Sequence, residues 1–398
     1  MPTGSCSTVW AFVSPVNVTE LEAWLQQRRS DHLYRQRQVV ESAQGAEVVV
    51  SGRRLVNFSS NDYLGLANHP EIIRAWQRGA GRYGVGSGAA HLICGHMGPH
   101  HELEEDLAEF TGRERALLFS TGYQANLGVI AALLEPGERL YQDRLNHASL
   151  LDGARIAGAR LRRYPHGDTV ILARWLARQP ATLIATDGVF SMDGDLAPLP
   201  RLADLAGAHD AWLYVDDAHG FGVLGENGAG TLEHYRLRQD QVPVLMATLG
   251  KAVGVFGAFV AGSETLIEAL IQRARTYTYT TALPPAVAEA VRAGLKLIRE
   301  QSWRREYLRH LIARFRQGAK ELGLPLMPFT TPIQPLLVGD SQKALTLSRK
   351  LWELGFWVAA IRPPTVPKGS ARLRITLTAG HGEDQVDQLL DALSQCLA

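Results

Sequence analysis

The feature that most constrains the fold is a regular alternation of short apolar runs and helix-like segments, which begins near Arg115. Such alternation is typical of βαβ units, whose crossover helices lay successive strands side by side in a mainly parallel sheet. We therefore expect an α/β protein with one large sheet. The expected strands are Ala116–Phe119, Arg139–Gln142, Arg160–Arg163, Thr182–Thr186, Trp212–Val215, Val242–Met246 and Ala258–Ala261.

The segments on either side of this alternation have different patterns. An amphipathic stretch over residues 21–34 precedes the strand and turn-rich loop of "RRLVNFSSNDYLGL". After Pro284 the periodicity becomes helical up to about Leu322, and a smaller α/β portion follows, with strands expected at Gln334–Val338 and Arg372–Thr378. The pattern predicts an N-terminal segment (1–55), a large cofactor-binding domain (56–284) and a small C-terminal domain (285–398).

Composition and charge exclude several classes of protein. The chain has 398 residues, of which 46% are hydrophobic and 20% charged, enough for a large core. A net charge of +1 gives no electrostatic attraction toward nucleic acid or a membrane surface. The three cysteines (Cys6, Cys94 and Cys396) are too few and too far apart for a disulfide framework or a zinc cluster, so we expect a cytoplasmic protein.

Polar and glycine-rich clusters follow four of the expected strands. They read "STGYQAN", "DGVFSMDGD", "DDAHGFG" and "ATLGKAVG". A single Asp after a strand is most often a helix cap. In a parallel sheet, however, ligands collect at the carboxyl ends of the strands, so these four clusters are expected at one edge.

The lysine of "ATLGKAVG" is unusual in this chain. Only six of the 41 basic residues are lysines, and Lys251 is the first of them. Arginine can serve for ion pairs and anion binding, but only an amine can lose its proton and form a Schiff base. Lys251 is therefore a candidate for covalent attachment of an aldehyde.

The four clusters together match the needs of pyridoxal 5'-phosphate (PLP). Its aldehyde needs an amine, for which Lys251 is the candidate, and its pyridine nitrogen needs a carboxylate, for which Asp216 is the candidate. Its phosphate needs backbone N–H groups at a helix start and short hydroxyls. The other candidates are Ser120, Gly122, Tyr123 and Thr248 for the phosphate, His219 and Ser191 for the phenolic oxygen, and His147 to cover the ring.

At this point the chain resembles the α-oxoamine synthases, which are PLP-dependent enzymes of fold type I. The motifs that carry the resemblance occur in the family's order from about Leu21 to the C-terminus, and include "FSTGYQAN", "NHASLLDGAR", "GVFSMDGD", "VDDAHGFGVLG", "ATLGKAVG", "YTTALPP" and "IRPPTVPKGSARLRITLTAGH". The resemblance implies a mainly parallel seven-stranded sheet in a large domain, a smaller C-terminal α/β domain, and a homodimer with shared active sites.

The resemblance also implies roles for individual residues. Lys251 would hold the cofactor and then, once free, remove the Cα proton of the amino acid, while His147 stacks on the ring. Arg362 would bind the amino-acid carboxylate. Asn61, Arg35 and Thr365 match positions that contact substrate, and Thr280 and Thr281 match a stretch that reaches the phosphate of the neighbouring subunit.

Within this family, "IQPLLVGD" and "AIRPPTVP" favour the branch that serves biotin synthesis. That branch condenses L-alanine with pimeloyl-CoA or a pimeloyl carrier protein and releases CO2. Two departures bear on specificity: Asp187 stands where the nearest relatives usually have Glu, and "GSGAAHLICG" replaces a loop richer in glycine and serine.

Other functions were weighed against this one. Glycine C-acetyltransferase and the synthases of aminolevulinate or acyl-ketone signals share the cofactor site and differ in their pockets. A non-catalytic regulatory paralogue would be expected to lose the lysine, whereas this chain keeps Lys251 together with Asp216 and His219. "GVGSGA" does not follow a strand, which argues against a nicotinamide site.

A metal site was also considered. His96, His100 and Glu104 lie at helical spacing in "GHMGPHHELEE", but Glu105 stands where the zinc-protease motif needs its second histidine. We therefore expect a capped, solvated helix start here and no metal.

Overall fold

The large sheet has the seven strands that the sequence predicts. The computed structural model describes residues 17–397. Its large-sheet strands are β3 (Arg115–Phe119), β4 (Arg139–Asp143), β5 (Arg160–Tyr164), β6 (Leu183–Asp187), β7 (Trp212–Asp216), β8 (Val244–Thr248) and β9 (Ala258–Gly262). The order is β3-β9-β8-β7-β6-β4-β5, with β9 antiparallel to both neighbours and the pairs from β8 to β5 parallel. The predicted α/β fold is confirmed, and each expected strand of this sheet ends within two residues of an observed one.

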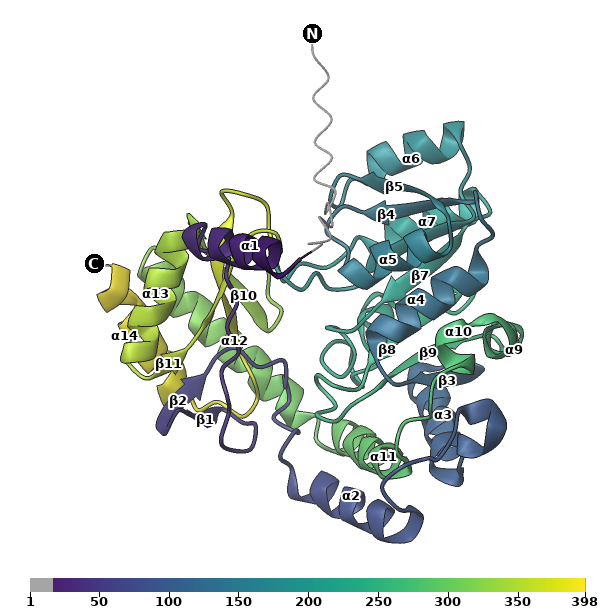
Figure 1. Cartoon of the computed structure of the whole chain (residues 1–398), viewed down its shortest axis with the longest axis horizontal. Helices are drawn as coiled ribbons and strands as arrows, with labels where there is room; N and C mark the ends of the chain where they lie inside the picture. Colours follow the sequence, from purple (N-terminus) through teal and green to yellow (C-terminus); the bar gives the residue numbers. More distant parts are fainter. Residues whose placement is uncertain (1–16, 398) are drawn as a thin grey trace.

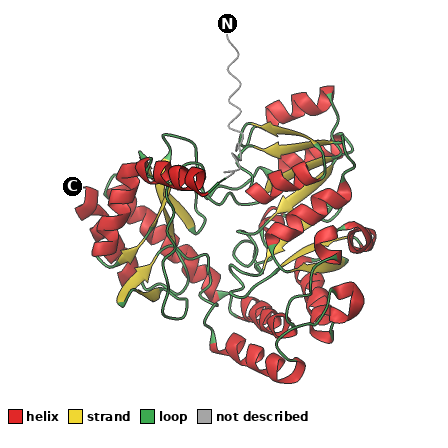
Figure 2. Ribbon diagram, in the orientation of Figure 1, coloured by secondary structure: helices red, strands yellow, loops and turns green. Residues whose placement is uncertain are grey.

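Helices cover both faces of this sheet (Figures 1 and 2). The helices of this larger part of the molecule are α2 (Pro70–Tyr83), the π-helix η1 (His91–Gly95), α3 (Gly98–Thr111), α4 (Gly122–Leu133), α5 (Ala148–Ile156), α6 (Thr169–Arg178), α7 (Leu199–Ala208), α8 (Thr231–Tyr235), α9 (Glu264–Arg273), α10 (Arg275–Thr278) and α11 (Pro285–Glu300). Leu117 and Phe119 of β3 share a core with α4, α5 and α9, whereas Leu118 packs with α3 and α11. Alternate residues of one strand are thus buried on opposite faces, which explains the continuous apolar runs in the sequence.

A smaller part of the molecule is built around two three-stranded sheets. Its elements are β10 (Ile333–Gly339), β12 (Ala359–Ile361), β13 (Ala371–Thr376), β1 (Glu47–Val50), β2 (Arg53–Asn57), β11 (Phe356–Trp357), α1 (Val18–Ser30), α12 (Trp303–Glu321), α13 (Ser341–Glu353) and α14 (Glu383–Leu397). One sheet has the order β10-β13-β12, and in the other β2 pairs with both β1 and β11. The N-terminal strands therefore join the C-terminal part of the chain, on the left in Figure 1.

One apolar core connects the two parts. It includes Phe58 after β2, Leu118 of the large sheet, Leu297 of α11, Phe315 of α12 and Leu373 of β13. This continuity fixes the carboxyl ends of the large-sheet strands relative to β13. The predicted domain boundaries at residues 55 and 284 stay predictions.

The structure confirms one local expectation and contradicts another. The stretch after Pro284 is helical up to about Leu322, as expected, and consists of two helices, because α11 ends at Glu300 and the Ser302 carbonyl starts a new helix by accepting from the N–H of Arg305. The stretch expected to be amphipathic forms α1, but no residue of that helix is buried. Among residues 17–397, no helix has both the length and the apolarity that crossing a membrane requires.

Candidate active site

The structure brings the predicted strand ends together at one edge of the large sheet. Asp187 and Asp216 end β6 and β7 and are paired in register, and Asp216 is also paired with Met246 of β8. Lys251 lies in the turn that follows β8. Residues that are distant in the sequence therefore meet here because neighbouring parallel strands end at the same edge.

Lys251 is the first member of a hydrogen-bonded chain of side chains. Its Nζ lies 2.8 Å from Nε2 of His219, and Nδ1 of His219 lies 2.5 Å from the hydroxyl of Tyr63. Burial keeps the pKa of His219 well below its ordinary value, and the charge of Lys251 adds to this effect. A neutral imidazole has one donor and one acceptor, so an ammonium on Lys251 makes Nδ1 the donor toward Tyr63.

Burial also changes how readily the amine of Lys251 loses its proton. It lowers the pKa of this amine to about 8, against an opposing effect of the Asp216 carboxylate, which raises it. At neutral pH, on the order of one amine in ten is therefore unprotonated, compared with fewer than one in a thousand for a free lysine. An amine with such a pKa can serve as nucleophile and as base.

The Asp216 carboxylate is held in place by neighbouring polar groups. Asn126 of α4 donates from Nδ2 to Asp216 Oδ2 at 2.7 Å, and the N–H of Ala218 donates to Oδ1 at 3.1 Å. Asn126 itself accepts a hydrogen bond of 2.6 Å from the hydroxyl of Tyr214. Asp216 is therefore buried in a fixed orientation at the carboxyl end of β7.

His147 lies at the N-cap of α5. Its backbone N–H donates to Asp187 Oδ1 at 3.2 Å, and its Nδ1 lies 2.7 Å from the hydroxyl of Ser149. Burial lowers the pKa of His147, while Asp216 raises it and Lys251 lowers it. These mutual effects place His147 within electrostatic range of Asp216 and Lys251. Asp187, the departure noted in the sequence, thus holds the backbone of His147.

The N-terminus of α4 faces the same edge. Ser120 follows β3, and Thr121 caps the helix by accepting from the N–H of Gln124 at 3.1 Å. The N–H groups of Gly122 and Tyr123 belong to the first turn, where an α-helix offers no acceptor of its own, so they suit an anion. Tyr123 also donates a hydrogen bond to Asp152.

Thr248 ends β8 and prepares the turn that carries Lys251. Its hydroxyl donates to the carbonyl of Gly257 at 3.0 Å and accepts weakly from the N–H of Gly250 at 3.4 Å. Gly254 has a φ of +78°, and a Cβ there would lie only 2.6 Å from backbone atoms of Leu66 and Ala67. Glycine is therefore required for this turn to pack against the loop after Tyr63.

Arg374 of β13 reaches this site from the smaller part of the molecule. Its Nε donates to the carbonyl of Ser191 at 2.6 Å, and its two terminal nitrogens lie 3.2 and 3.1 Å from Asn61 Oδ1. Its positive charge lowers the pKa of both Lys251 and His219. Arg374 is thus a buried cation close to the candidate lysine.

The other substrate candidates lie in a second group. Arg35 donates to the hydroxyl of Thr365 at 3.1 Å, and Arg362 donates to the carbonyl of His32. Burial and the charges of Arg35 and Arg28 lower the pKa of Arg362. The structure therefore brings Arg35, Arg362 and Thr365 together, but their described contacts are with one another and with the chain after α1.

Thr280 and Thr281 lie between α10 and α11. Thr281 forms a β-bridge with Ala90, and the N–H of Ala282 donates to the carbonyl of Ala89 at 3.0 Å. Thr280 is half-buried and Thr281 is exposed. This segment is thus fixed against the loop that precedes η1.

Comparisons with known proteins agree with this geometry. The model of the aminotransferase class I and II family matches residues 53–393. The chain belongs to this family. It is 62% identical over 378 residues to an 8-amino-7-oxononanoate synthase of Pseudomonas putida F1, covering 95% of this chain and 97% of the relative.

Solved structures of this aminotransferase family share the fold. A serine palmitoyltransferase from S. paucimobilis with bound PLP and myriocin superposes with a TM-score of 0.89 at 30% identity, covering 94% and 96% of the two chains. An 8-amino-7-oxononanoate synthase from Francisella tularensis gives a TM-score of 0.76 at 32% identity, covering 86% and 97%. The chain is therefore a fold type I PLP-dependent transferase.

The residues present fit PLP, the cofactor of this family. The edge of the sheet offers an amine with a lowered pKa at Lys251, an oriented carboxylate at Asp216 and the free N–H groups of the first turn of α4. These three groups match the aldehyde, the pyridine nitrogen and the phosphate of the cofactor.

Sequence reasoning missed three residues of this site. They are Tyr63, Asn126 and Arg374, which hold His219, Asp216 and Asn61 respectively. All three lie within motifs already recognised in the sequence. The alternation of two arginines with apolar residues in β13 (Ala371–Thr376) was a usable signal, because an arginine on a buried strand needs a specific partner.

Proposed function

We propose that this protein is an 8-amino-7-oxononanoate synthase, which condenses L-alanine with a pimeloyl thioester, either pimeloyl-CoA or a pimeloyl carrier protein. The reaction forms a bond between the alanine Cα and the acyl carbon, breaks the thioester C–S bond, and releases CO2 and the thiol. The observation that carries the proposal is the desolvated Lys251 beside Asp216, in a chain 62% identical to synthases of that name.

Each residue of the site would have a defined task. Bound PLP supplies an electrophilic aldehyde and a protonated ring that accepts the electron pair of the amino-acid Cα. Lys251 holds the cofactor and, once free, takes the Cα proton and later returns one. Asp216 keeps the ring nitrogen protonated, and Asn126 keeps Asp216 in place. His147 covers the ring, and His219 and Ser191 are assigned to its phenolic oxygen.

Cofactor and substrate anions need separate positive or N–H-rich sites. Ser120, Gly122, Tyr123 and Thr248 are assigned to the phosphate. Two arginines are candidates for the alanine carboxylate. The sequence favours Arg362, but the electrostatic effect of Arg374 on Lys251 makes Arg374 the better placed of the two.

Arg35, Thr365 and Asn61 remain the candidates for substrate contacts. The hydrogen bond between Arg35 and Thr365 joins the chain after α1 to the segment after β12 (Ala359–Ile361). If Arg374 takes the alanine carboxylate, the cationic group of Arg35 and Arg362 is available for an anionic part of the acyl donor.

We further propose that the protein is a homodimer in which Thr280 and Thr281 reach the phosphate of the neighbouring subunit. Large apolar side chains near this segment support such an interface: Tyr279 is 72% exposed and Ile93 of η1 is 79% exposed. Mixing Lys251→Ala protein with a Thr280→Ala/Thr281→Ala double variant tests the shared site. One intact site per hybrid dimer would restore about one quarter of the parental activity.

The decisive experiment is steady-state release of free thiol with a matrix of amino acids and acyl thioesters. L-Alanine with a pimeloyl thioester should give the highest kcat/KM. Glycine with acetyl-CoA as the better pair would instead indicate glycine C-acetyltransferase, and no turnover with any pair would indicate a regulatory paralogue. Borohydride reduction of the holoenzyme and peptide mapping should place the label on Lys251. The cytoplasmic location expected from the sequence stays a prediction.

A further inference from the structure

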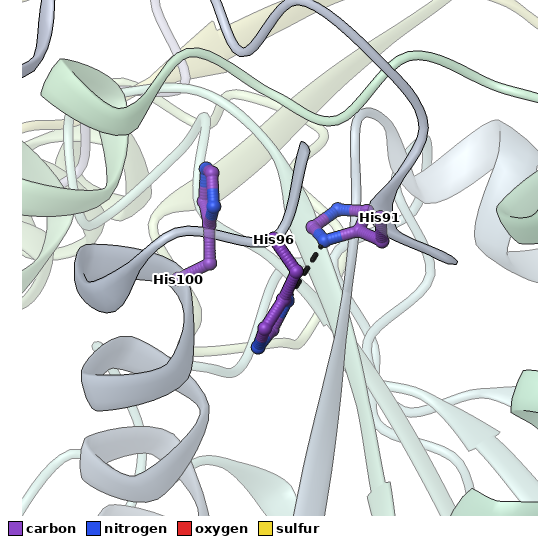
Figure 3. A group of neighbouring side chains, drawn as sticks. All are labelled: His91, His96 and His100. Atoms are coloured by element: carbon purple, nitrogen blue, oxygen red, sulfur yellow. Dashed lines mark hydrogen bonds between the residues drawn. The ribbon is translucent and has the colours of Figure 1, made fainter. Parts of the chain in front are cut away.

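A cluster of histidines lies where η1 meets α3, outside the site described above. His91 begins η1, His96 follows that helix, and His100 lies in the first turn of α3 (Figure 3). The Nδ1 atoms of His91 and His96 are 3.0 Å apart, and one ring nitrogen from each of the three residues lies within 4.8 Å of the others. The expectation of a solvated helix start was wrong, because His100 and Glu104 are buried by other segments of this chain.

The three side chains are of the ligand type that suits such an ion. Imidazole nitrogen is a common protein ligand of zinc, copper and nickel. His91 and His100 are buried, and the ring of His91 packs edge-on against His100 and stacks on Tyr277, so these two rings are held in place by their neighbours.

The spacing of His91 and His96 suits a shared ion. Two nitrogen ligands of a tetrahedral zinc ion, each about 2.0–2.1 Å from it, lie about 3.3 Å apart. The observed Nδ1–Nδ1 distance of 3.0 Å is within about 0.3 Å of that value. The hydrogen now held between the two Nδ1 atoms would move to Nε2 of the same ring, so no proton is released.

Glu104 lies near the place of the outer contact that metal-binding histidines usually have, at a separation longer than a hydrogen bond. Its Oε2 lies 4.0 Å from Nε2 of His96, on the opposite side of the ring from His91. A ligating histidine commonly donates its other N–H to a carboxylate, which fixes the tautomer and the ring orientation. The N–H of Leu118 donates to Glu104 Oε1 at 3.0 Å and thereby anchors this carboxylate on β3.

His100 differs from the other two rings because both of its nitrogens already have partners. Its Nδ1 accepts from the N–H of Met97 at 2.9 Å, and its Nε2 lies 2.7 Å from the carbonyl of Leu283. It can ligate an ion only by releasing one of these contacts. His91 and His96 are therefore the core ligands, and His100 is the weaker third.

We propose that His91, His96 and His100 form a binding site for a divalent transition metal ion, with Zn²⁺ as the best fit, and that Glu104 orients His96. The ion would cross-link the loop before α3 to the first turn of that helix. Ala90, next to His91, forms a bridge with Thr281, so the ion would also stiffen the contact between these two loops. The site does not depend on the proposed synthase activity.

Titration of tag-free, metal-stripped holoenzyme with Zn²⁺, followed by calorimetry, tests the proposal. We expect one ion per chain, with His91→Asn and His96→Asn each weakening binding by at least about 100-fold and Glu104→Gln by about 10- to 100-fold. His101→Asn is the matched control, because His101 is exposed on the same helix turn and pairs with Glu105. This variant should bind as the parent does.

Other results would overturn the proposal. Parental protein that binds no ion would show that His91 and His96 form only a hydrogen-bonded pair. Loss of binding in His101→Asn, with His91→Asn unaffected, would move the ion to the neighbouring group of His96, His101 and Glu104. If a variant fails to fold, X-ray absorption spectroscopy of the Co²⁺-loaded parental protein tests the same assignment. Fewer than two imidazole ligands on the ion would refute it.

Discussion

Replacing His166 with glutamine would remove a cation that lies between two buried carboxylates beside the active site. Its Nδ1 lies 2.9 Å from Asp143 and its Nε2 lies 2.8 Å from Asp195. Burial lowers the pKa of His166, but the hydrogen bonds and charges of the two carboxylates outweigh burial and raise it to about 10. Asp143 Oδ1 also accepts from the N–H of Leu145 at 2.8 Å, at the start of the loop that leads to His147.

The size of this stabilisation follows from the difference between the pKa of His166 in the folded and in the unfolded protein. An unfolded histidine titrates near 6.5, so the raised pKa stabilises the fold fully below about pH 6.5, and this stabilisation is lost as the pH rises through about 10. At about 1.36 kcal/mol per pKa unit, the contribution is about 4 to 5 kcal/mol at pH 6 and below about 0.5 kcal/mol at pH 10. The side chain is 30% exposed, and solvent screening reduces the value at pH 6 to roughly 2 kcal/mol or more.

Urea unfolding of parental protein and His166→Gln at pH 6, 8 and 10, at saturating PLP, measures this difference. The free energy of unfolding of the variant should be lower by about 2 kcal/mol or more at pH 6, and the gap should close by pH 10. His234→Gln, at an exposed histidine, is the control and should show no such gap. A gap that stays constant from pH 6 to pH 10 would refute the reasoning, because it would show that the charge of His166 is not what stabilises the fold.

Three further predictions concern the proposed reaction. Asp216→Asn should lower kcat on the order of 100-fold, measured as thiol release, because an amide does not stabilise a protonated ring nitrogen; an unchanged kcat would contradict the assigned role. Arg374→Gln should raise the KM for alanine about 10- to 100-fold, the loss expected for a charged hydrogen bond, and the same increase in Arg362→Gln alone would restore the sequence-based assignment. In the PLP-free protein, acylation of Lys251 followed by peptide mass spectrometry should have its pH midpoint near 8; Asp216→Asn should lower that midpoint, since the carboxylate raises the pKa of this amine.

The large sheet could be predicted from sequence because its strands carry their own signal. All five residues of β6 are buried, so the strand is a short apolar run bounded by polar turns. β1 was missed although its three consecutive valines are such a signal, whereas two other missed strands lack it. β11 has two residues and β12 three, and β12 is only half-buried. They are strands because distant segments, β2 and β13, offer them partners.

The site shows the same division between local and tertiary information. Lys251, Asp216 and His219 could be assigned from the turns that follow their own strands. Tyr63 contacts His219 across 156 residues of sequence, and Arg374 contacts Asn61 across 313. These pairings depend on how the small part packs on the sheet edge, which no local pattern specifies. The burial of His100 was missed for the same reason, because Leu283 covers it from another segment.

In the proposed site, Asp216 would face a cation in the protein without cofactor as well as with it. Burial lowers the pKa of the Lys251 amine, and the carboxylate of Asp216 opposes this by favouring the ammonium form. With PLP bound to Lys251 that ammonium would be absent, and in the proposed site Asp216 would instead balance the protonated ring nitrogen. The same buried carboxylate would therefore face a cation in both states. Since Asn126 donates to this carboxylate in the cofactor-free geometry, its orientation does not have to be created when PLP binds.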